Sequence, residues 1–426
     1  MLYGRSAAHA SRTRISSKTL NPVAPAEREP LLDALRGFAI LGILLVNVEI
    51  MRGPDWLVLT GGGTLEQPHT ADRIAQFAIG WLATAKFISS LAILFGIGAA
   101  LMTGRAVART DSARPLLARR YAWLMAFGLA HMLLYPGDVL FVYGVTGLTL
   151  LAFITRSPRA VLSCSVALIL AFFGLALIYS VGVSAGNVLL AGKSAVTPIA
   201  DASIQDLLDR TIAAYASGSF AEIATIHVAH AVSLQAGQLY MLPWILALFL
   251  FGFWCGQMGI ARDFRAWRPR LRRGAVLGLA IGLPANLGVG YGGPLAGYGG
   301  FSDPMWVTLW IASAQLLGAP VLAVGYLCAL SLWFLRRGVI SPLAAVGRMA
   351  LTAYVLESAL ALAVFGGLRL YGQLSTSAAV LVVGGVWTVL LVVCPLWLRH
   401  FQLGPLEWLW RSLTYGRVQR LTAPSA

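Results

Sequence analysis

Ten apolar stretches, each long enough to cross a bilayer, constrain this chain more than any other feature of its sequence. They cover residues 31–51, 74–103, 116–135, 138–155, 160–184, 236–258, 271–292, 304–335, 344–369 and 377–398. Of the 426 residues, 58% are hydrophobic and 12% are charged, which lies outside the range of soluble domains. The sequence therefore predicts an all-α, polytopic membrane protein with about ten transmembrane helices and the lipid bilayer as its surroundings.

The positive charges predict the orientation of these helices. If the N-terminus lies inside, the cytoplasmic side receives almost all of the 32 Lys and Arg residues, as the positive-inside rule requires. Six fall on the outer side or in outer halves of spans: Arg52, Arg73, Lys86, Lys193, Arg210 and Arg369. We therefore expect both termini in the cytoplasm. The net charge of +15 does not indicate nucleic acid, because no soluble domain with a basic face is evident.

The apolar stretches also divide the chain into regions. We expect a cytoplasmic N-terminal tail, five transmembrane helices, a partly helical extracytoplasmic loop, five more transmembrane helices, and an interfacial helix with a cytoplasmic tail. These regions span residues 1–29, 30–184, 185–235, 236–400 and 401–426, respectively. Helical periodicity over Ile204–Tyr215 and Phe220–Ser233 predicts that the loop folds over the outer end of the protein as a lid.

The first apolar stretch carries an unusual set of polar and small residues. Asp33 and Arg36 lie three residues apart where it begins, on one helical face, and Asn47 lies near its far end. A structural interpretation is available, since Asp33 favours the helix dipole and Arg36 marks the cytoplasmic border. The alternative is a site, because Gly37 and Gly42 allow another helix to pack closely and a buried Asn needs a partner.

Lys86 lies deep in the second stretch, where a charge is costly to insert. It requires an acidic partner, for which Glu357 is a candidate, or a negatively charged ligand. His227 and His230 could share one helical face, but two ligands without a third do not predict a metal site. We expect no metal.

His131 and Asp138 flank the turn at Pro136-Gly137 in the segment AHMLLYPGDVLFVYG. The turn allows the two side chains to approach each other near the outer leaflet, and a carboxylate that orients a histidine is the usual arrangement of a general base. The structural alternative is a surface histidine and an aspartate that caps the next helix. His69, in TLEQPHTADRI, is most simply a solvated loop residue.

Five segments in this order resemble the motifs of the YeiB-like bacterial inner-membrane family, a domain of unknown function numbered 418. They are LLDALRGFAILGILLVNV, KFISSLAILFGIG, HMLLYPGDVLFVYG, GRMALTAYVLES and GPLEWLWRSLTYG, which together extend over nearly the whole chain. The resemblance implies a multi-pass protein of the bacterial inner (cytoplasmic) membrane. It does not supply a reaction.

The first motif is also similar to the opening of two wider groups, the acyltransferase-three family and the heparan-glucosaminide acetyltransferases. Those enzymes move an acyl group from cytoplasmic acyl-CoA to a sugar hydroxyl or amine across the membrane. The acyltransferase-three pattern has histidine where this chain has Asn47. The heparan enzymes have Asn there and a catalytic histidine in the next outer segment, where this chain has His69 at a different spacing. The catalytic histidine is therefore His131, with Asp138, or His69.

The resemblance implies roles in donor binding for the other polar residues. Acyl-CoA, with acetyl-CoA the typical donor, is polyanionic, so Arg36 beside Asp33, together with Arg348, would hold its phosphates. Lys86, Asn47 and Tyr354 would follow along the channel, with a donor near Asn47 stabilising the oxyanion. The acceptor would be an envelope glycan or another small molecule.

Two other functions compete with the acyltransferase. A transporter or exporter of a small metabolite also fits ten spans with buried charges, but the two halves show no matching broken helices of an inverted repeat. A structural or sensory membrane protein would use the outer loop as its binding element. The sequence leaves open whether the protein forms a homodimer.

Overall fold

The computed structural model describes residues 29–60, 68–107, 113–191, 202–293 and 305–422. The predicted cytoplasmic tail, residues 1–29, lies outside this part of the chain except for Glu29. Helices form nearly all of the described structure, and its β-structure is one isolated bridge between Phe401 and Thr422. The predicted all-α fold is therefore confirmed.

The helices follow the predicted apolar stretches closely. The first half contains α1 (Pro30–Met51), α2 (Asp55–Thr60), α3 (Thr70–Leu82), α4 (Lys86–Val107), α5 (Arg114–His131), α6 (Leu140–Leu150) and α7 (Pro158–Ala191). A hairpin of α8 (Ala202–Ser217) and α9 (Phe220–Tyr240) follows. The second half contains α10 (Leu242–Gln257), α11 (Arg268–Ala285), α12 (Leu287–Gly292), α13 (Met305–Ser313), α14 (Ala319–Arg337), α15 (Ser341–Arg348), α16 (Ala350–Leu362), α17 (Thr376–His400) and α18 (Pro405–Tyr415). Helix therefore forms in each of the ten stretches.

Six helical segments of the described chain are long and apolar enough to cross a membrane, or seven if α9 and α10, which meet at a bend of 57°, count as one span. The protein is thus a membrane protein. The number ten and the placement of both termini in the cytoplasm stay predictions, because several stretches form shorter helices.

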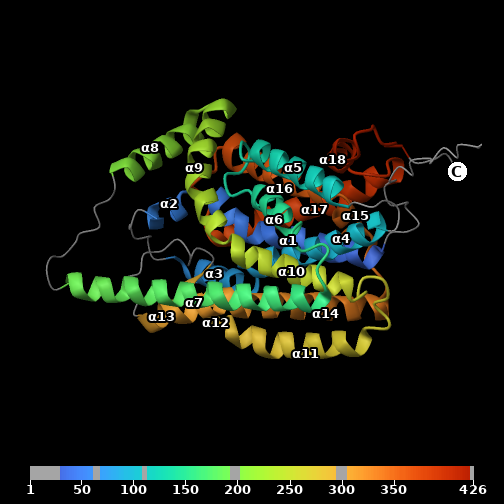
Figure 1. Ribbon diagram of the computed structural model, residues 1–426. Coiled ribbons are helices and arrows are strands. Elements are labelled where there is room, and N and C mark those ends of the chain that lie inside the picture. The colour runs from blue at the N-terminus through green and yellow to red at the C-terminus, as the bar shows by residue number, and fades with distance from the viewer. Residues whose placement is uncertain (1–28, 61–67, 108–112, 192–201, 294–304, 423–426) are drawn as a thin grey trace, which may run out of the picture.

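Helix α1 runs through the middle of the bundle, and glycines allow its neighbours to approach (Figure 1). A methyl group on Gly37 would lie 2.1 Å from the carbonyl oxygen of Leu343, and one on Gly42 would lie 2.1 Å from the ring of Phe87. Since real Cβ atoms do not approach so closely, a side chain at 37 would displace the backbone of α15, and one at 42 would displace the Phe87 ring. This confirms the expected close packing at Gly37 and Gly42.

Two predicted long spans are interrupted. The stretch 74–103 breaks between α3 and α4, where Ala85 has a left-handed backbone with φ 66°. The stretch 304–335 contains a π-helical turn over Ala314–Gly318, which ends two residues before Pro320. A π-turn and a proline are recognised causes of helix distortion.

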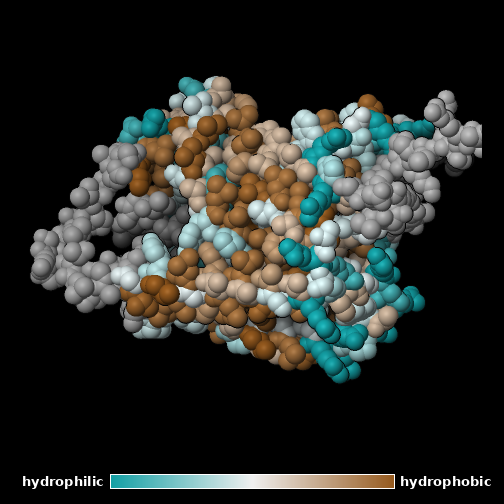
Figure 2. All heavy atoms as spheres, in the orientation of Figure 1, coloured by the Kyte–Doolittle hydropathy of each residue, from teal (hydrophilic) through white to brown (hydrophobic). Residues whose placement is uncertain are grey.

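The two ends of the bundle differ in character (Figure 2). Hydrophilic residues gather at the end that carries α18, where α11 begins with four arginines and α14 ends with Arg336 and Arg337. We call it the arginine-rich end. The α8–α9 hairpin extends at the opposite end, and its helices confirm the predicted periodicity.

Candidate functional site

A cavity of about 640 Å³ lies among α1, α4, α5, α6, α16 and α18, and we call it the arginine cavity. Its volume is that of a typical small-molecule site. Its polar lining consists mainly of Glu29, Asp33, Arg36, Arg120, Arg262, Arg348, Glu407 and Arg411, with Tyr121, Tyr143, Tyr354 and Tyr415. Apolar side chains such as Ile40, Leu91, Leu94 and Phe95 line the rest. The cavity is therefore charged toward the arginine-rich end and apolar deeper in the bundle.

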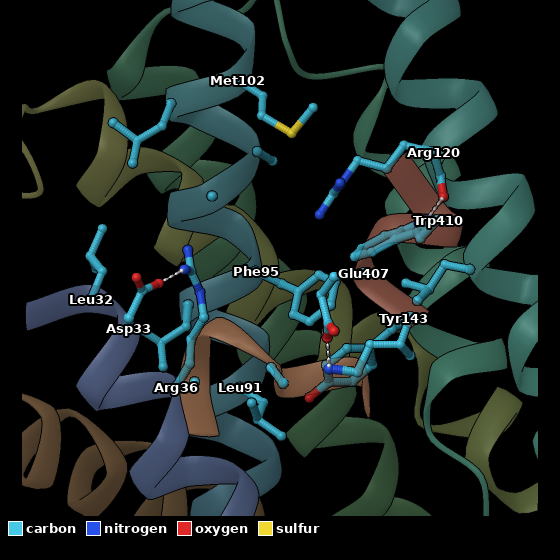
Figure 3. A pocket seen from close by; sticks show the side chains of 18 of the residues that line it. Leu32, Asp33, Arg36, Leu91, Phe95, Met102, Arg120, Tyr143, Glu407 and Trp410 are labelled. Atoms are coloured by element: carbon cyan, nitrogen blue, oxygen red, sulfur yellow. Dashed lines mark hydrogen bonds and ion pairs between the residues drawn. The ribbon is translucent and has the colours of Figure 1, made fainter. Parts of the chain in front are cut away.

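Five arginines face the cavity, and most of them have no acidic partner. Arg36 forms an ion pair with Asp33 at 2.8 Å (Figure 3). Arg120 lies 3.6 Å from the centre of the Trp410 ring, whose indole donates back to the Arg120 carbonyl at 2.9 Å. Within the described part of the chain, the other four arginines of the cavity form no ion pair. Figure 3 shows Arg36 and Arg120 pointing into the same space from opposite walls. Such a surplus of guanidinium groups suits a ligand with several negative charges.

Helix α18 is fixed to the cavity by Glu407. The buried carboxylate accepts hydrogen bonds from the backbone N–H of Leu351 at 2.6 Å and of Thr352 at 3.0 Å, and from the Thr352 hydroxyl at 2.6 Å. It therefore caps the first turn of α16. Burial raises the pKa of Glu407, while these hydrogen bonds act in the opposite direction. Burial also lowers the pKa of Arg411, although a guanidinium keeps its charge at any physiological pH.

The deep end of the cavity is closed by Tyr354 and Val139. The Tyr354 hydroxyl accepts a hydrogen bond from the Val139 N–H at 3.3 Å, and both residues line the cavity. Behind this wall lies His131, whose ring centre is 4.8 Å from that of Tyr354. The cavity therefore ends one side chain away from the predicted histidine.

His131 and Asp138 form the predicted pair. The Nδ1 atom of His131 lies 2.8 Å from Oδ1 of Asp138, and both side chains are buried. In the neutral ring, a proton on Nδ1 would face this carboxylate and leave the lone pair of Nε2 free, which is the arrangement that a general base requires. That Nε2 atom is buried and has no hydrogen-bond partner among the described residues.

The second oxygen of Asp138 accepts from the Phe141 N–H at 2.8 Å, so Asp138 also caps α6. Asp138 therefore contacts both His131 and the first turn of α6. The other alternative, a surface histidine at 131, is wrong because the ring is buried beneath Tyr354.

Close approach of α5 and α6 makes this pairing possible. A methyl group on Gly128 would lie 2.3 Å from the Phe141 nitrogen and 2.6 Å from Oδ2 of Asp138. Because the first of these is a backbone atom, a side chain at 128 would force the two helices apart. Gly128 thus sets the distance at which His131 meets Asp138.

The predicted donor-binding residues separate into two groups. Asp33, Arg36, Arg348 and Tyr354 all line the arginine cavity. Asn47 does not line it, is half-buried, and has no side-chain hydrogen bond to any described residue. The expectation that Asn47 is a buried, partnered side chain is therefore wrong.

Lys86 is fully buried but does not line the cavity either. Its ammonium group donates to the Gly80 carbonyl at 2.8 Å, in the last turn of α3, where orphan carbonyls attract a cation. The suggested partner Glu357 is not in contact with it, and both Glu357 carboxyl oxygens lack a hydrogen-bond partner within the described structure. Lys86 thus binds the carboxyl end of α3 at the break between α3 and α4.

His69 is exposed at the start of α3 and does not line the cavity. It occupies the capping position of that helix without a side-chain hydrogen bond. Its position agrees with the interpretation as a solvated loop residue.

Sequence reasoning missed several lining residues. Arg120, Arg262 and Arg411 were indistinguishable from arginines that set topology, and Glu407 stood in a segment expected to lie flat in the membrane interface. Tyr143 gave no signal of its own. All five sequence motifs contribute residues to the lining, however. Grouping the polar residues of these motifs would therefore have pointed to one common site.

Comparison with known sequences gives a consistent family. The profile described as "Protein of unknown function (DUF418)" matches residues 255–417. The chain is 31% identical to "Uncharacterized protein YxaH" of Bacillus subtilis over 416 residues, which covers 93% of this chain and 96% of that protein. It is 29% identical to "Uncharacterized protein YeiB" of Escherichia coli over 404 residues, covering 91% and 96%. No solved structure matches the chain significantly.

Proposed function

Since the chain belongs to the YeiB-like DUF418 family of membrane proteins, whose name gives no reaction, we propose from its geometry that it is an acyltransferase. In this proposal an acyl group passes from cytoplasmic acyl-CoA to an acceptor hydroxyl or amine that approaches from the other side of the bacterial inner membrane. The arginine-rich end then faces the cytoplasm, in agreement with the positive-inside rule.

One observation carries the proposal: a single cavity leads from five arginines to a tyrosine that packs against a buried His–Asp pair. Residues of all five sequence motifs line it, although these motifs are dispersed over the whole chain. The charges of the cavity would suit a carrier as well, but acyl transfer also needs a general base, which the oriented histidine behind the cavity wall can supply.

The distribution of charge in the cavity fits acyl-CoA. At one end, this donor carries a diphosphate and a ribose phosphate, and at the other a thioester on an uncharged arm. Arg36, Arg120, Arg348 and Arg411 would bind the phosphates through charge-assisted hydrogen bonds. The apolar lining at Leu91, with Leu94 and Phe95, would surround the arm and bring the thioester to Tyr354.

The chemistry follows from the geometry of His131. Nε2 removes the proton from the acceptor hydroxyl as its oxygen attacks the thioester carbonyl, and Asp138 stabilises the imidazolium through Nδ1–H. The carbon–sulfur bond breaks, and the proton passes to the departing thiolate, which leaves as CoA thiol. The Tyr354 hydroxyl, which accepts from Val139, has its own proton to donate to the oxyanion. It takes the place first expected for Asn47.

Purified protein and labelled acetyl-CoA test this proposal. We expect CoA to bind with a micromolar or tighter dissociation constant and labelled acetyl groups to appear on members of a panel of sugars and amino sugars. Neither CoA binding nor transfer to any acceptor would overturn the proposal. CoA binding without transfer, together with CoA movement across the membrane in proteoliposomes, would favour the carrier.

A further inference from the structure

A second, much smaller cavity lies on the other side of the His–Asp pair. It has a volume of about 20 Å³, and we call it the histidine pocket. Aromatic and polar side chains dominate its lining, among them Trp56, Tyr215, His227, His230, Ser358 and Tyr371. The described residues that line it include no lysine, arginine or carboxylate, so the histidine pocket suits an uncharged ligand.

Two segments of the chain contribute residues to both cavities. The His131–Asp138 pair therefore lies between the arginine cavity and the histidine pocket. On α16, Tyr354 lines the arginine cavity and Ser358, one turn further, lines the histidine pocket. Between α5 and α6, Val139 faces the cavity and Pro136 faces the pocket. The ring of Tyr135, also in the pocket lining, lies 6.3 Å from that of His131. A ligand in the pocket would therefore reach His131 from the side away from the arginines.

The pocket alternates aromatic faces with hydrogen-bonding groups. Tyr215 and Tyr371 stack with ring centres 3.8 Å apart, and the Tyr215 hydroxyl lies 2.6 Å from Nε2 of His227. Nε2 of His230 lies 3.0 Å from the hydroxyl of Thr211, and its ring meets Trp56 edge to face. Aromatic faces that receive C–H groups, beside imidazoles and hydroxyls that bind hydroxyls, are the chemistry that recognises a carbohydrate.

The pocket is covered by the α8–α9 hairpin, which is attached to the bundle by specific polar contacts. Nδ1 of His227 lies 2.9 Å from the Leu133 carbonyl, and the Gln235 amide donates to the Asp138 carbonyl at 2.8 Å. The buried apolar residues Ala214, Tyr215, Ile223 and Ile226 form a cluster of their own, apart from the main core. At Met241, α9 meets α10 at a bend of 57° (Figure 1).

We propose that the histidine pocket is the closed form of the acceptor site and that its ligand is a small, neutral carbohydrate. This inference rests on the proposed acyl transfer. A volume of 20 Å³ holds about one water molecule, so the sugar enters only when the α8–α9 hairpin moves away at Met241. The hydroxyl to be acylated then lies beside Nε2 of His131.

Thiol labelling of the full-length protein tests the site without relying on acyl transfer. The four native cysteines are replaced by alanine, and Ser358→Cys reports on the pocket through its reaction rate with N-ethylmaleimide. Ser331→Cys in α14 is the matched control, because both serines are buried and both hydroxyls bond to the carbonyl four residues earlier. The probes are glucose, N-acetylglucosamine and glycerol, all of which are uncharged.

We expect slow labelling at position 358 that at least one of the two hexoses reduces about fivefold when it is present at four times its dissociation constant. Glycerol and the control position should show no such protection. His227→Leu, which removes the bond to Leu133, should open the hairpin and speed labelling roughly 3- to 10-fold. No labelling at 358, or equal rates with and without every probe, would overturn the proposal.

Coenzyme A binding to the same cysteine-free protein separates the two proposals. If CoA binds and no sugar protects position 358, the acceptor site is wrong and the donor cavity stands. If a hexose protects and CoA does not bind, the histidine pocket is a carbohydrate site and the acyltransferase fails.

Discussion

The arginine cavity and the histidine pocket lie on either side of one His–Asp pair, yet they differ in almost every property. The cavity is about 640 Å³ and contains five arginines, whereas the pocket is about 20 Å³ and contains no charged side chain. One is fit for a long anion and the other, once opened, for a neutral molecule. This difference teaches that two chemically unlike substrates would meet at His131 without sharing a binding surface.

Removing the residue between the two cavities should have the largest effect. His131→Ala takes away the general base, and we expect kcat to fall by about 10²- to 10⁴-fold, while the dissociation constant of CoA changes little because His131 lines neither cavity. His69→Ala is the control and should keep full activity, since His69 is exposed at the start of α3. Loss of activity with His69→Ala alone would show that the general base is His69 and does not lie between the two cavities. Acetyl transfer and CoA binding are measured in parallel.

Neutralising the arginines should affect the arginine cavity alone. Arg120→Gln or Arg411→Gln removes a guanidinium from a phosphate, so we expect CoA to bind about 10- to 100-fold more weakly, with sugar protection at Ser358→Cys unchanged. The control is Arg273→Gln, an exposed arginine of α11 outside the cavity. Titration calorimetry gives the affinities. Equal weakening by all three substitutions would indicate a diffuse charge effect instead of a site.

A single methyl group at Gly128 should disturb the contact between α5 and α6 that holds His131 against Asp138. Gly128→Ala places Cβ 2.3 Å from the Phe141 nitrogen, so we expect a loss of about 1–3 kcal/mol in the free energy of unfolding and reduced transfer. Gly174→Ala in α7 is the control, because its added methyl group would meet no atom within 4 Å. Thermal melts in detergent compare the two variants. A Gly128→Ala protein as stable and active as the parent would show that α5 and α6 need not meet so closely.

The smallest predicted effect is a pH dependence that only the arginine cavity should show. Burial raises the pKa of Glu407, and a bound polyanion raises it further, so binding takes up a proton and affinity falls as pH rises through that raised pKa. The stability of the fold changes with pH in the same direction. The stability that protonated Glu407 contributes to the folded protein is lost as pH rises through its raised pKa. Dephospho-CoA is the probe, because its diphosphate does not titrate between about pH 5 and 8.

Glu407→Gln should flatten this pH profile by a few-fold between its ends. The amide keeps an acceptor for the N–H groups of Leu351 and Thr352 but cannot ionise. An unchanged slope in Glu407→Gln would assign the pH dependence to another group.

The sequence predicted the helices well because a membrane helix depends on a local run of apolar residues. Asp33 and Arg36, which it singled out, both line the arginine cavity. It failed at Asn47, which lies about 16 Å further along α1 than Arg36 at 1.5 Å per residue. The cavity reaches only Ile40 on that helix, and this limit is set by Tyr354, Val139 and Leu91 from other helices. Such a limit depends on tertiary packing.

Lys86 illustrates the other reason for failure. A buried lysine in an apolar run suggested an acidic partner or ligand, but its partner is the Gly80 carbonyl at a helix break. The break itself depends on the left-handed residue Ala85, which no sequence pattern indicated.

The central claim, that the arginine cavity binds acyl-CoA by its phosphates, is tested most directly by comparing the affinities of CoA and pantetheine for the purified protein. Both contain the thiol arm, and only CoA contains phosphates. We predict that CoA binds at least about 100-fold more tightly, as two or more charge-assisted contacts would give, and that added salt reduces the difference. Equal affinities for the two compounds, or no binding of CoA, would contradict the account.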